Sequence, residues 1–434
     1  MVFRQATVVF LLIFSSFHFS ASHAQTDTLH VSKSELEAIF LKNNLILLSE
    51  NLNISKAEAE IIQAKVWPNP TLSIDEVNLW RPKHIGTEEL IPPLAGDFGR
   101  NQQFSIGFEQ LIVTAGKRKK LIELKKIGAE QHQQYFEEVL RNLKLEFRLQ
   151  LFELEHLNSI RSIIENQLTS INLLLNAYKN QVEQGFLNKG EAIRLGALSL
   201  SIQNELNTIE TEYDEIEHTV KLLLNIPLTS HLRIKEEVYN KEIESLKFTV
   251  ESLVATAKAN RPDYHLSNLA EKYAEQQLKV ERAERIPDIS LLGEYNRGDG
   301  IYRDFVGFGI AFDLPVFNRN KGGIKMANIE LEQAKINQKF VNNSIEKEVS
   351  LALNQLQRAQ NFTSNIEENY EEELDQVLFS YTENFKNKNI NLLEYLDFLE
   401  AYLDNKHILL EAKLNLKSKV EELNYIIGKD LISF

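Results

Sequence analysis

Side chains capable of catalysis or metal binding are few and scattered in this sequence. The ten histidines form neither an HExxH motif nor a close pair on one predicted helix face, and cysteine is absent. Metal sites need ligands at fixed short spacings, and thiol catalysis and disulfides need cysteine. No nucleophile with a nearby base and no phosphate-binding loop stands out. We therefore predict that the chain is not an enzyme and has no catalytic, cofactor-binding or metal site.

Two carboxylates have a spacing that could still serve a function. Glu394 and Asp397 follow a predicted turn at 386–391 and are three residues apart, so they share one face of the next helix. Glu191 and Arg194 occupy the matching positions after an earlier turn. In a soluble bundle these residues would be ordinary solvated charges, and that interpretation stays open beside a functional one.

Long stretches without helix breakers position these residues. Between Lys117 and Gln184 there is no proline and one glycine, Gly128, and no glycine occurs between Gly323 and Gly428. In the first stretch apolar side chains recur about every 3.5 residues, which is typical of a left-handed coiled coil. A helix of about 67 residues would reach ~100 Å. Such a helix does not fit a compact domain.

The chain contains two copies of one unit, which indicates an internal duplication. A shift of 203 residues places Asn188 on Asn391 and Glu191 on Glu394, and a shift of 216 places Lys42 on Lys258. Each copy is predicted to contain a helix, a strand pair, a very long helix, a turn and a returning helix. In copy one these are at 33–66, 70–80 with 101–112, 117–184 and 191–225; in copy two they are at 250–285, 288–296 with 304–314, 321–386 and 391–427.

The start of the sequence predicts export. Arg4, an apolar run at 8–14, and Ser22 and Ala24 before a plausible cleavage site form a secretory signal peptide over 1–24; a short membrane anchor is the alternative. No other stretch is apolar for the 18 residues that a membrane-spanning helix needs. The predicted domains are this signal peptide, a first structural repeat at 25–226, an equatorial linker element at 227–249, and a second structural repeat at 250–434 with a short C-terminal tail.

The net charge bears on possible partners. With 48 basic and 62 acidic residues the formal charge is −14. A chain this acidic repels polyanions, so we predict no nucleic-acid partner.

The strand segments alternate bulky apolar with small or polar residues. This pattern fits strands with lipid on one face and water on the other, although a half-buried soluble sheet alternates in the same way. Gly307 and Gly309 fit small residues facing water. Four short strands cannot cover their own edges, and an open edge is forbidden in lipid, so partner copies would have to close the sheet. The predicted lipid-facing residues are Phe104, Ile106, Phe108, Val306, Phe308, Ile310 and Phe312.

The duplication, the strand placement and the turns together resemble the TolC-type outer-membrane efflux channel family. The resemblance rests on WPNP at 67–70, FEQLIVTAGKRKK at 108–120, LPVFNRNKGG at 314–323 and the two hairpin turns. The strand-end motifs resemble most the cobalt–zinc–cadmium efflux branch. The resemblance to the TolC-type family implies a mainly α fold with β structure. Long coiled-coil hairpins form two repeats, and each repeat gives a strand pair to a trimeric 12-stranded outer-membrane β-barrel above a periplasmic α-helical tunnel.

The resemblance also implies a function, partners and a location. The expected protein is a homotrimer in the Gram-negative outer membrane, surrounded by outer-membrane lipid and extending into the periplasm. It would passively conduct cargo, including heavy-metal cations, that an inner-membrane efflux pump exports through a periplasmic adaptor protein. Residues Glu394, Asp397, Glu191 and Arg194 would form the periplasmic gate, and the adaptor would contact Gly185, Asn188, Gly190 and Asn391 at the hairpin tips. A periplasmic coiled-coil adaptor or structural protein is the alternative.

Overall fold

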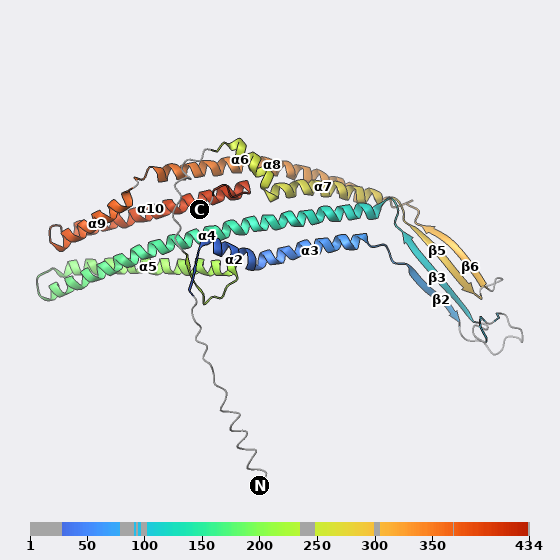
Figure 1. Cartoon of the computed structure of the whole chain (residues 1–434), viewed down its shortest axis with the longest axis horizontal. Helices are drawn as coiled ribbons and strands as arrows, with labels where there is room; N and C mark the ends of the chain where they lie inside the picture. Colours follow the sequence, from blue (N-terminus) through green and yellow to red (C-terminus); the bar gives the residue numbers. More distant parts are fainter. Residues whose placement is uncertain are drawn as a thin grey trace, which may run out of the picture.

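The molecule is long, with a bundle of helices at one end and a small sheet at the other (Figure 1). The computed structural model describes residues 28–78, 91–92, 94–96, 102–234, 248–298, 304–367 and 369–432. The predicted signal peptide, Trp80 and most of the two loops beyond the strands lie outside these residues. Among the helices that the structure describes, none is both long and apolar enough to cross a membrane.

The same order of elements occurs twice along the chain. The first repeat contains β1 (Thr28–Val31), α2 (Lys33–Asn43), α3 (Leu45–Lys65), β2 (Thr71–Asn78), β3 (Gln103–Ile112), α4 (Lys117–Glu183) and α5 (Lys189–Leu224). After β4 (His231–Ile234), the second contains α6 (Val250–Asn260), α7 (Pro262–Ala283), β5 (Ile289–Arg297), β6 (Asp304–Phe312), α8 (Lys321–Ser364), α9 (Tyr370–Lys386) and α10 (Leu392–Ile427). The linker region is described only in part, and its β4 pairs in parallel with β1.

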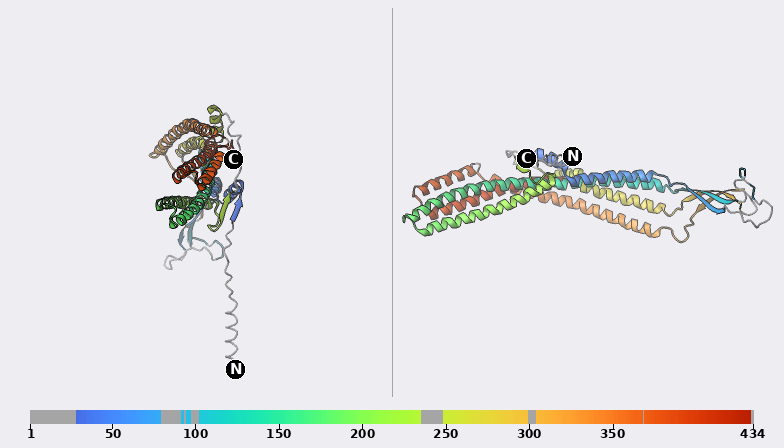
Figure 2. Two further views of the ribbon diagram at one scale, coloured as in Figure 1. Left: turned by 90° about the vertical axis from the view of Figure 1, so that its left-hand side faces the viewer. Right: turned by 90° about the horizontal axis from the view of Figure 1, so that it is seen from below.

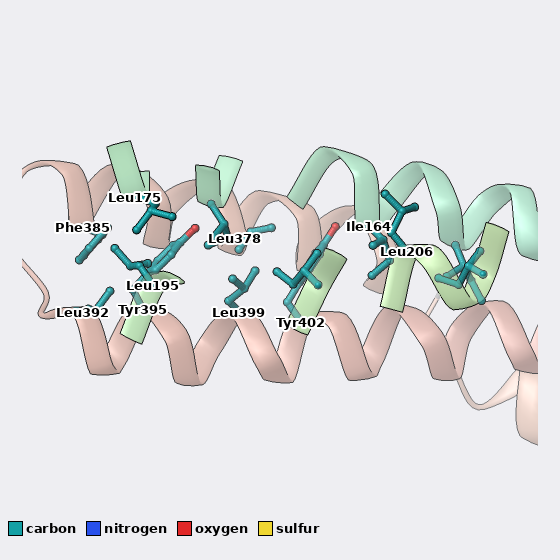
Figure 3. Close-up of a cluster of buried hydrophobic side chains, with 14 of the residues drawn as sticks. Ile164, Leu175, Leu195, Leu206, Leu378, Phe385, Leu392, Tyr395, Leu399 and Tyr402 are labelled. Atoms are coloured by element: carbon teal, nitrogen blue, oxygen red, sulfur yellow. The ribbon is translucent and has the colours of Figure 1, made fainter. Parts of the chain in front are cut away.

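The helix α4 runs along most of the helical body, as its apolar period predicts. It has 67 residues, and α3 and α5 lie end to end beside it (Figure 2). The largest buried cluster lies towards the hairpin tips, where Ile164, Leu195 and Leu399 from three helices pack together (Figure 3). Leucine and isoleucine side chains repeated on each helix thus bury the seam between the two hairpins.

The prediction of one continuous helix over 321–386 is wrong. The structure ends α8 at Ser364 and begins α9 at Tyr370. No glycine or proline marks the interruption, but Thr363, Ser364 and Asn365 are poor helix formers. Three glutamates then occupy the first turn of α9, where negative charge is favourable beside the positive end of the helix dipole.

The helices predicted over 33–66 and 250–285 are each divided as well. In the first repeat the division falls at Asn44, whose side-chain oxygen accepts hydrogen bonds from the Ile46 and Leu47 amides. In the second it falls at Arg261, which has extended backbone because Pro262 follows it. The two breaks are 217 residues apart, so the offset of 216 predicted for this part of the repeat is wrong by one residue.

Both hairpin turns use one backbone motif at the predicted offset of 203. Gly185 and Lys388 have positive φ values of 78° and 60°. At each turn the next amide donates to a carbonyl five residues earlier, from Phe186 to Gln181 and from Asn389 to Asn384. This is the Schellman helix end, which favours glycine at the left-handed position. Lysine in the second turn therefore carries a local conformational cost of about 1 kcal/mol.

The four strands of the larger sheet are antiparallel in the order β2-β3-β5-β6. Strands β3 and β5, one from each repeat, are hydrogen-bonded in the centre, with Phe108 opposite Gly293. This pairing joins the two repeats. Strands β2 and β6 are the edges, and within the described residues neither has a strand on its outer side.

Candidate functional site

One face of the larger sheet carries all seven side chains that were predicted to face lipid. Directly opposed residues share a face, and the register aligns Leu72, Phe108, Gly293 and Phe308 in one row. The flanking row aligns Ile74, Ile106, Tyr295 and Val306. Phe308 is 90% exposed. No described residue covers Phe308 and the apolar side chains beside it, so this part of the face exposes side chains that need an apolar environment or a partner.

The opposite face is formed mainly by small and polar residues. Ser73, Gly107, Glu294 and Gly307 form one row, and the Ser105 hydroxyl donates to the Glu294 carboxylate at 3.0 Å. Glu109 and Asp75 share this face, so the four-stranded surface presents carboxylates from three strands. The alternation in the sequence predicted the two faces of each strand. The register between the strands is what places Asp75, Glu109 and Glu294 on the same face of the sheet.

Phe305 is a large apolar side chain on the polar face, as are Leu111 and Leu292. Its register partner is Asn296, and its ring lies over Gly307, where an added Cβ would come within 2.6 Å of it. Gly307 therefore leaves space for an aromatic side chain as well as providing a small residue. The sequence analysis missed this role, and the Phe-x-Gly spacing is the signal that indicates it.

The predicted tip residues have defined backbone roles. Asn188 and Asn391 are the N-caps of α5 and α10, and Gly185 adopts the left-handed conformation that the turn requires. Gly190 lies inside α5 with ordinary helical backbone, and its amide donates to the Asn188 side chain at 2.9 Å.

Glu394 has a structural role beside its predicted place at the gate. Its carboxylate accepts from the Asn391 amide at 3.1 Å, while the Glu394 amide donates to Asn391 Oδ1 at 3.0 Å. This reciprocal capping box stabilises the start of α10. The spacing Asn-x-x-Glu is the sequence signal for it. Glu394 is nevertheless exposed, so it presents charge at the tip.

Of the other three predicted gate residues, Glu191 lies in the first turn of α5, and Arg194 and Asp397 lie one turn further along α5 and α10. Asp397 and Arg194 are exposed, and Glu191 is half-buried in the first turn of α5. The structure places Arg194 and Asp397 at equivalent positions of the two repeats. Within the described part of this chain Arg194 forms no ion pair.

Aromatic rings connect the two hairpins just behind the tips. The Phe385 ring stacks against Tyr178 with centroids 5.9 Å apart and against Tyr395 at 4.7 Å. Burial raises the pKa of Tyr395, so its hydroxyl stays protonated at neutral pH. Such offset stacking adds stability beyond area burial and fixes α4 against α9 and α10. The positions of the aromatic residues in the sequence did not indicate this contact.

A buried lysine, Lys406, links α9 to α10 on the tip side of the break between α8 and α9. The Lys406 ammonium group lies 2.8 Å from Asp375 and 3.5 Å from Glu371, and the Tyr402 hydroxyl donates to Asp375. Burial alone would raise the pKa of Glu371, but Lys413 and Lys406 lower it. The pair of helices is thereby held as one hairpin although the outer helix is interrupted.

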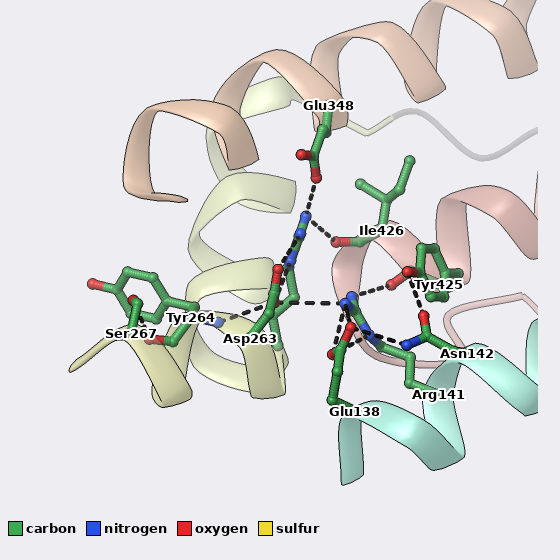
Figure 4. Close-up of polar contacts among 10 residues, drawn as sticks. Glu138, Arg141, Asn142, Asp263, Tyr264, Ser267, Glu348, Tyr425 and Ile426 are labelled. Carbon is green, nitrogen blue, oxygen red and sulfur yellow. Dashed lines mark hydrogen bonds and ion pairs between the residues drawn. The ribbon is translucent and has the colours of Figure 1, made fainter. Parts of the chain in front are cut away.

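Arginines hold the helices together midway along the body (Figure 4). The buried Arg261 guanidinium group lies 2.6 Å from both Asp263 and Glu348 and donates to the Ile426 carbonyl. Arg141 donates to the next carbonyl back, that of Tyr425, and its guanidinium group stacks over the Tyr425 ring. This network ties α4, α7 and α8 to the last turn of α10.

The first repeat has an equivalent contact. The Asn44 amide donates to the Leu223 carbonyl at 2.9 Å, and Leu223 is 203 residues before Ile426. In each repeat, the residue at the break between the two short helices therefore secures the end of the returning helix.

These features define a class of protein, the duplicated helical-hairpin channels with an open four-stranded sheet. Residues 253–429 match the model of the outer membrane efflux protein family. The match confirms the predicted class and its location in the outer membrane. A comparison with curated protein sequences found no match.

Solved structures extend the fold to the whole chain. The crystal structure of CusC, solved to follow its folding and transmembrane channel formation, is 18% identical to this chain with a TM-score of 0.71. The match covers 93% of this chain and 94% of CusC. The CmeC outer membrane channel of Campylobacter jejuni is 14% identical with a TM-score of 0.72, covering 92% and 87%. The open MtrE outer membrane channel of Neisseria gonorrhoeae is 16% identical with a TM-score of 0.67, covering 92% and 89%. The predicted fold class is therefore confirmed.

Proposed function

We propose that this chain is one protomer of a homotrimeric outer-membrane efflux channel. The observation that carries the proposal is the larger sheet: an exposed apolar face, an acidic opposite face and two edges without partners. Three copies would pair β6 of one protomer with β2 of the next, close a 12-stranded barrel and remove every edge. The helical hairpins would then form the periplasmic tunnel, and cargo would pass through without a chemical step.

A test of the channel uses the protein extracted from outer-membrane fractions in mild detergent. The unheated sample should migrate as a trimer and the heated sample as a monomer, because barrel closure depends on hydrogen bonds between copies. The same material should give stepwise currents in planar bilayers. A monomer that gives no current would contradict the proposal and would favour the alternative, a periplasmic adaptor or structural protein.

We also propose that Glu394, Asp397, Glu191 and Arg194 form the periplasmic gate. Glu394 and Asp397 are exposed on one helix face, and threefold symmetry would bring six carboxylates around the axis, where they would favour cations. The acidic face of the sheet supports the same cargo class, and heavy-metal divalent cations are the proposed cargo.

The gate is tested by Glu394→Gln combined with Asp397→Asn. Glutamine retains the capping hydrogen bond to the Asn391 amide, so the start of α10 is kept while the charge is removed. Cation-over-anion selectivity and block by divalent cations in bilayer recordings should both fall. Glu400→Gln, an exposed acid farther along α10, should leave both unchanged. If wild type and the double variant showed the same selectivity and the same block, the two acids would be ordinary solvated surface charges.

The partners that we propose are an inner-membrane efflux pump and a periplasmic adaptor that contacts the tips at Gly185, Asn188, Gly190 and Asn391. Leu173 and Phe186, near these tips, are 68% and 76% exposed, as expected of a contact surface. Asn188 and Asn391 are helix caps, so cysteines are better placed beside them at Lys189 and Asn389, in a chain without other cysteines. Both should crosslink to an adaptor in intact cells, while cysteine at Lys335, midway along α8, should not. If a reagent that cannot enter the cell modified these cysteines, the tips would lie outside the cell and the proposed orientation would be wrong.

A further inference from the structure

An exposed apolar segment continues beyond the sheet into the approach to α8. Leu314, Val316 and Phe317 follow β6 and are 71%, 60% and 102% exposed. In the sequence Leu314 and Val316 continue the spacing of Ile310 and Phe312, beyond the end of β6 at Phe312. Nothing in the described part of the chain covers them, and they lie where the sheet meets the helical body.

The charge at this end is opposite to that of the whole chain. Residues 113–120 contain four basic and no acidic side chains, and residues 313–325 contain three basic and one acidic, although the chain carries −14 overall. Both stretches lie at the starts of the long helices, next to the sheet (Figure 1). A local excess of positive charge on an acidic protein indicates an anionic partner at this place.

Several of these cations have partners within the chain. Lys117 is paired with Glu284 and Asp288, and the Arg118 guanidinium group stacks over the Trp67 ring at 4.2 Å. Lys120 donates to the Ala115 carbonyl. Lys119, Lys321 and Lys325 are exposed, and none of them forms an ion pair with a described residue. These three ammonium groups are available to an external anion.

These three lysines lie near helix N-termini, and contacts within the described part of the chain do not account for positive charge at that place. Neither α4 nor α8 has an acidic residue in its first turn. Helix α3 has neither an acid nor a cation there, whereas α2, α5, α6, α7 and α10 each have one acid and α9 has three. Cations near a helix N-terminus are unfavourable beside the positive end of the dipole. Only the two helices that start beside the sheet carry this arrangement, once in each repeat.

We propose that Leu314, Val316 and Phe317, together with Lys119, Lys321 and Lys325, form a surface that binds anionic phospholipids of the periplasmic leaflet. The apolar side chains enter the boundary of the acyl chains, and the ammonium groups contact the phosphates. The inference rests on the proposed function, because the apolar face of the sheet must lie in the same membrane.

The test uses Trp67, which is 58% exposed and lies against Arg118, the residue before Lys119 in α4. With Trp80→Phe, Trp67 is the only tryptophan of the full chain. The protein is reconstituted into mixed phosphatidylcholine and phosphatidylglycerol vesicles in which one or the other lipid carries brominated acyl chains. Brominated phosphatidylglycerol should quench Trp67 about threefold more effectively than brominated phosphatidylcholine, as expected of several lysines at an anionic surface.

The preference should disappear in Lys119→Gln, Lys321→Gln, Lys325→Gln and at high salt, where the charges are screened. A matched control replaces the exposed Lys179, Lys189 and Lys388 near the opposite end with glutamine, and it should keep the preference. Equal quenching by both lipids in the wild-type chain would overturn this inference and leave the channel proposal standing. Loss of the preference in the control would also overturn it. No quenching by either lipid would overturn the membrane placement itself.

Discussion

Phe308→Arg is expected to abolish the assembled trimer in the outer membrane. Phe308 is 90% exposed, and its row of Leu72, Phe108 and Gly293 is the middle one of the apolar face. An arginine at the bilayer midplane of a barrel costs about 2–4 kcal/mol, and a trimer would meet this cost three times. Trimer yield in outer-membrane fractions, measured without heating, should fall to background.

The matched control for this substitution is Ala311→Arg. Ala311 is also exposed in β6, but its partner Ser290 places it on the opposite, water-facing side. The same side chain in the same strand should therefore be tolerated, with a trimer yield near that of wild type. If the two variants assemble equally well, the apolar face does not contact lipid, and a soluble sheet becomes the better interpretation.

Arg261→Ala is expected to cause the largest loss of stability in the helical body. Arg261 is 5% exposed, and its guanidinium group is the partner of both Asp263 and Glu348. Its removal leaves Glu348 without this partner and leaves Asp263 with only the longer 3.6 Å contact to Arg141. Breaking a buried ion pair costs about 3–5 kcal/mol, and the low end applies here because both acids are partly exposed. Urea unfolding of the detergent-solubilised protein, followed by circular dichroism, measures this loss. Lys335→Ala, which breaks an exposed pair with Glu332, should cost below about 1 kcal/mol.

The Arg261 contact also predicts a pH dependence. Burial would raise the pKa of Asp263, but Arg261 lowers it below the ordinary value of 3.8. A carboxylate with a lowered folded-state pKa stabilises the protein above its unfolded pKa, and this contribution is lost as the pH falls through the folded value. The stability difference between wild type and Arg261→Ala should thus be constant near neutral pH and shrink below about pH 4. A difference that persists at lower pH would assign the effect to packing.

The parts that local patterns predict well are long and regular. Helix α4 was expected over 117–184 and occupies Lys117–Glu183, because an unbroken apolar period over so many residues has few other solutions. The break between α8 and α9 was missed because neither glycine nor proline marks it. Weak helix formers such as Ser364 allow either outcome, and tertiary packing decides between them.

The candidate site was predicted unevenly for the same reason. Alternation identified Phe308 and its neighbours, since the side-chain period of a strand is fixed by covalent geometry. The capping role of Glu394 was readable in the Asn-x-x-Glu spacing but was overlooked. The stack of Tyr178 on Phe385 was not readable, because it joins residues that are 207 positions apart.

The sequence by itself determined the duplication, the length of the longest helix, the two faces of each strand and the family resemblance. All of these follow from short-range periods or from motifs within a few residues. Only the tertiary structure decided that β3 of one repeat pairs with β5 of the other, which places Glu109, Glu294 and Asp75 on one surface. It also decided that Asn44 and Arg261 secure the ends of α5 and α10. Such contacts depend on which distant segments meet, and a local pattern carries no information about that choice.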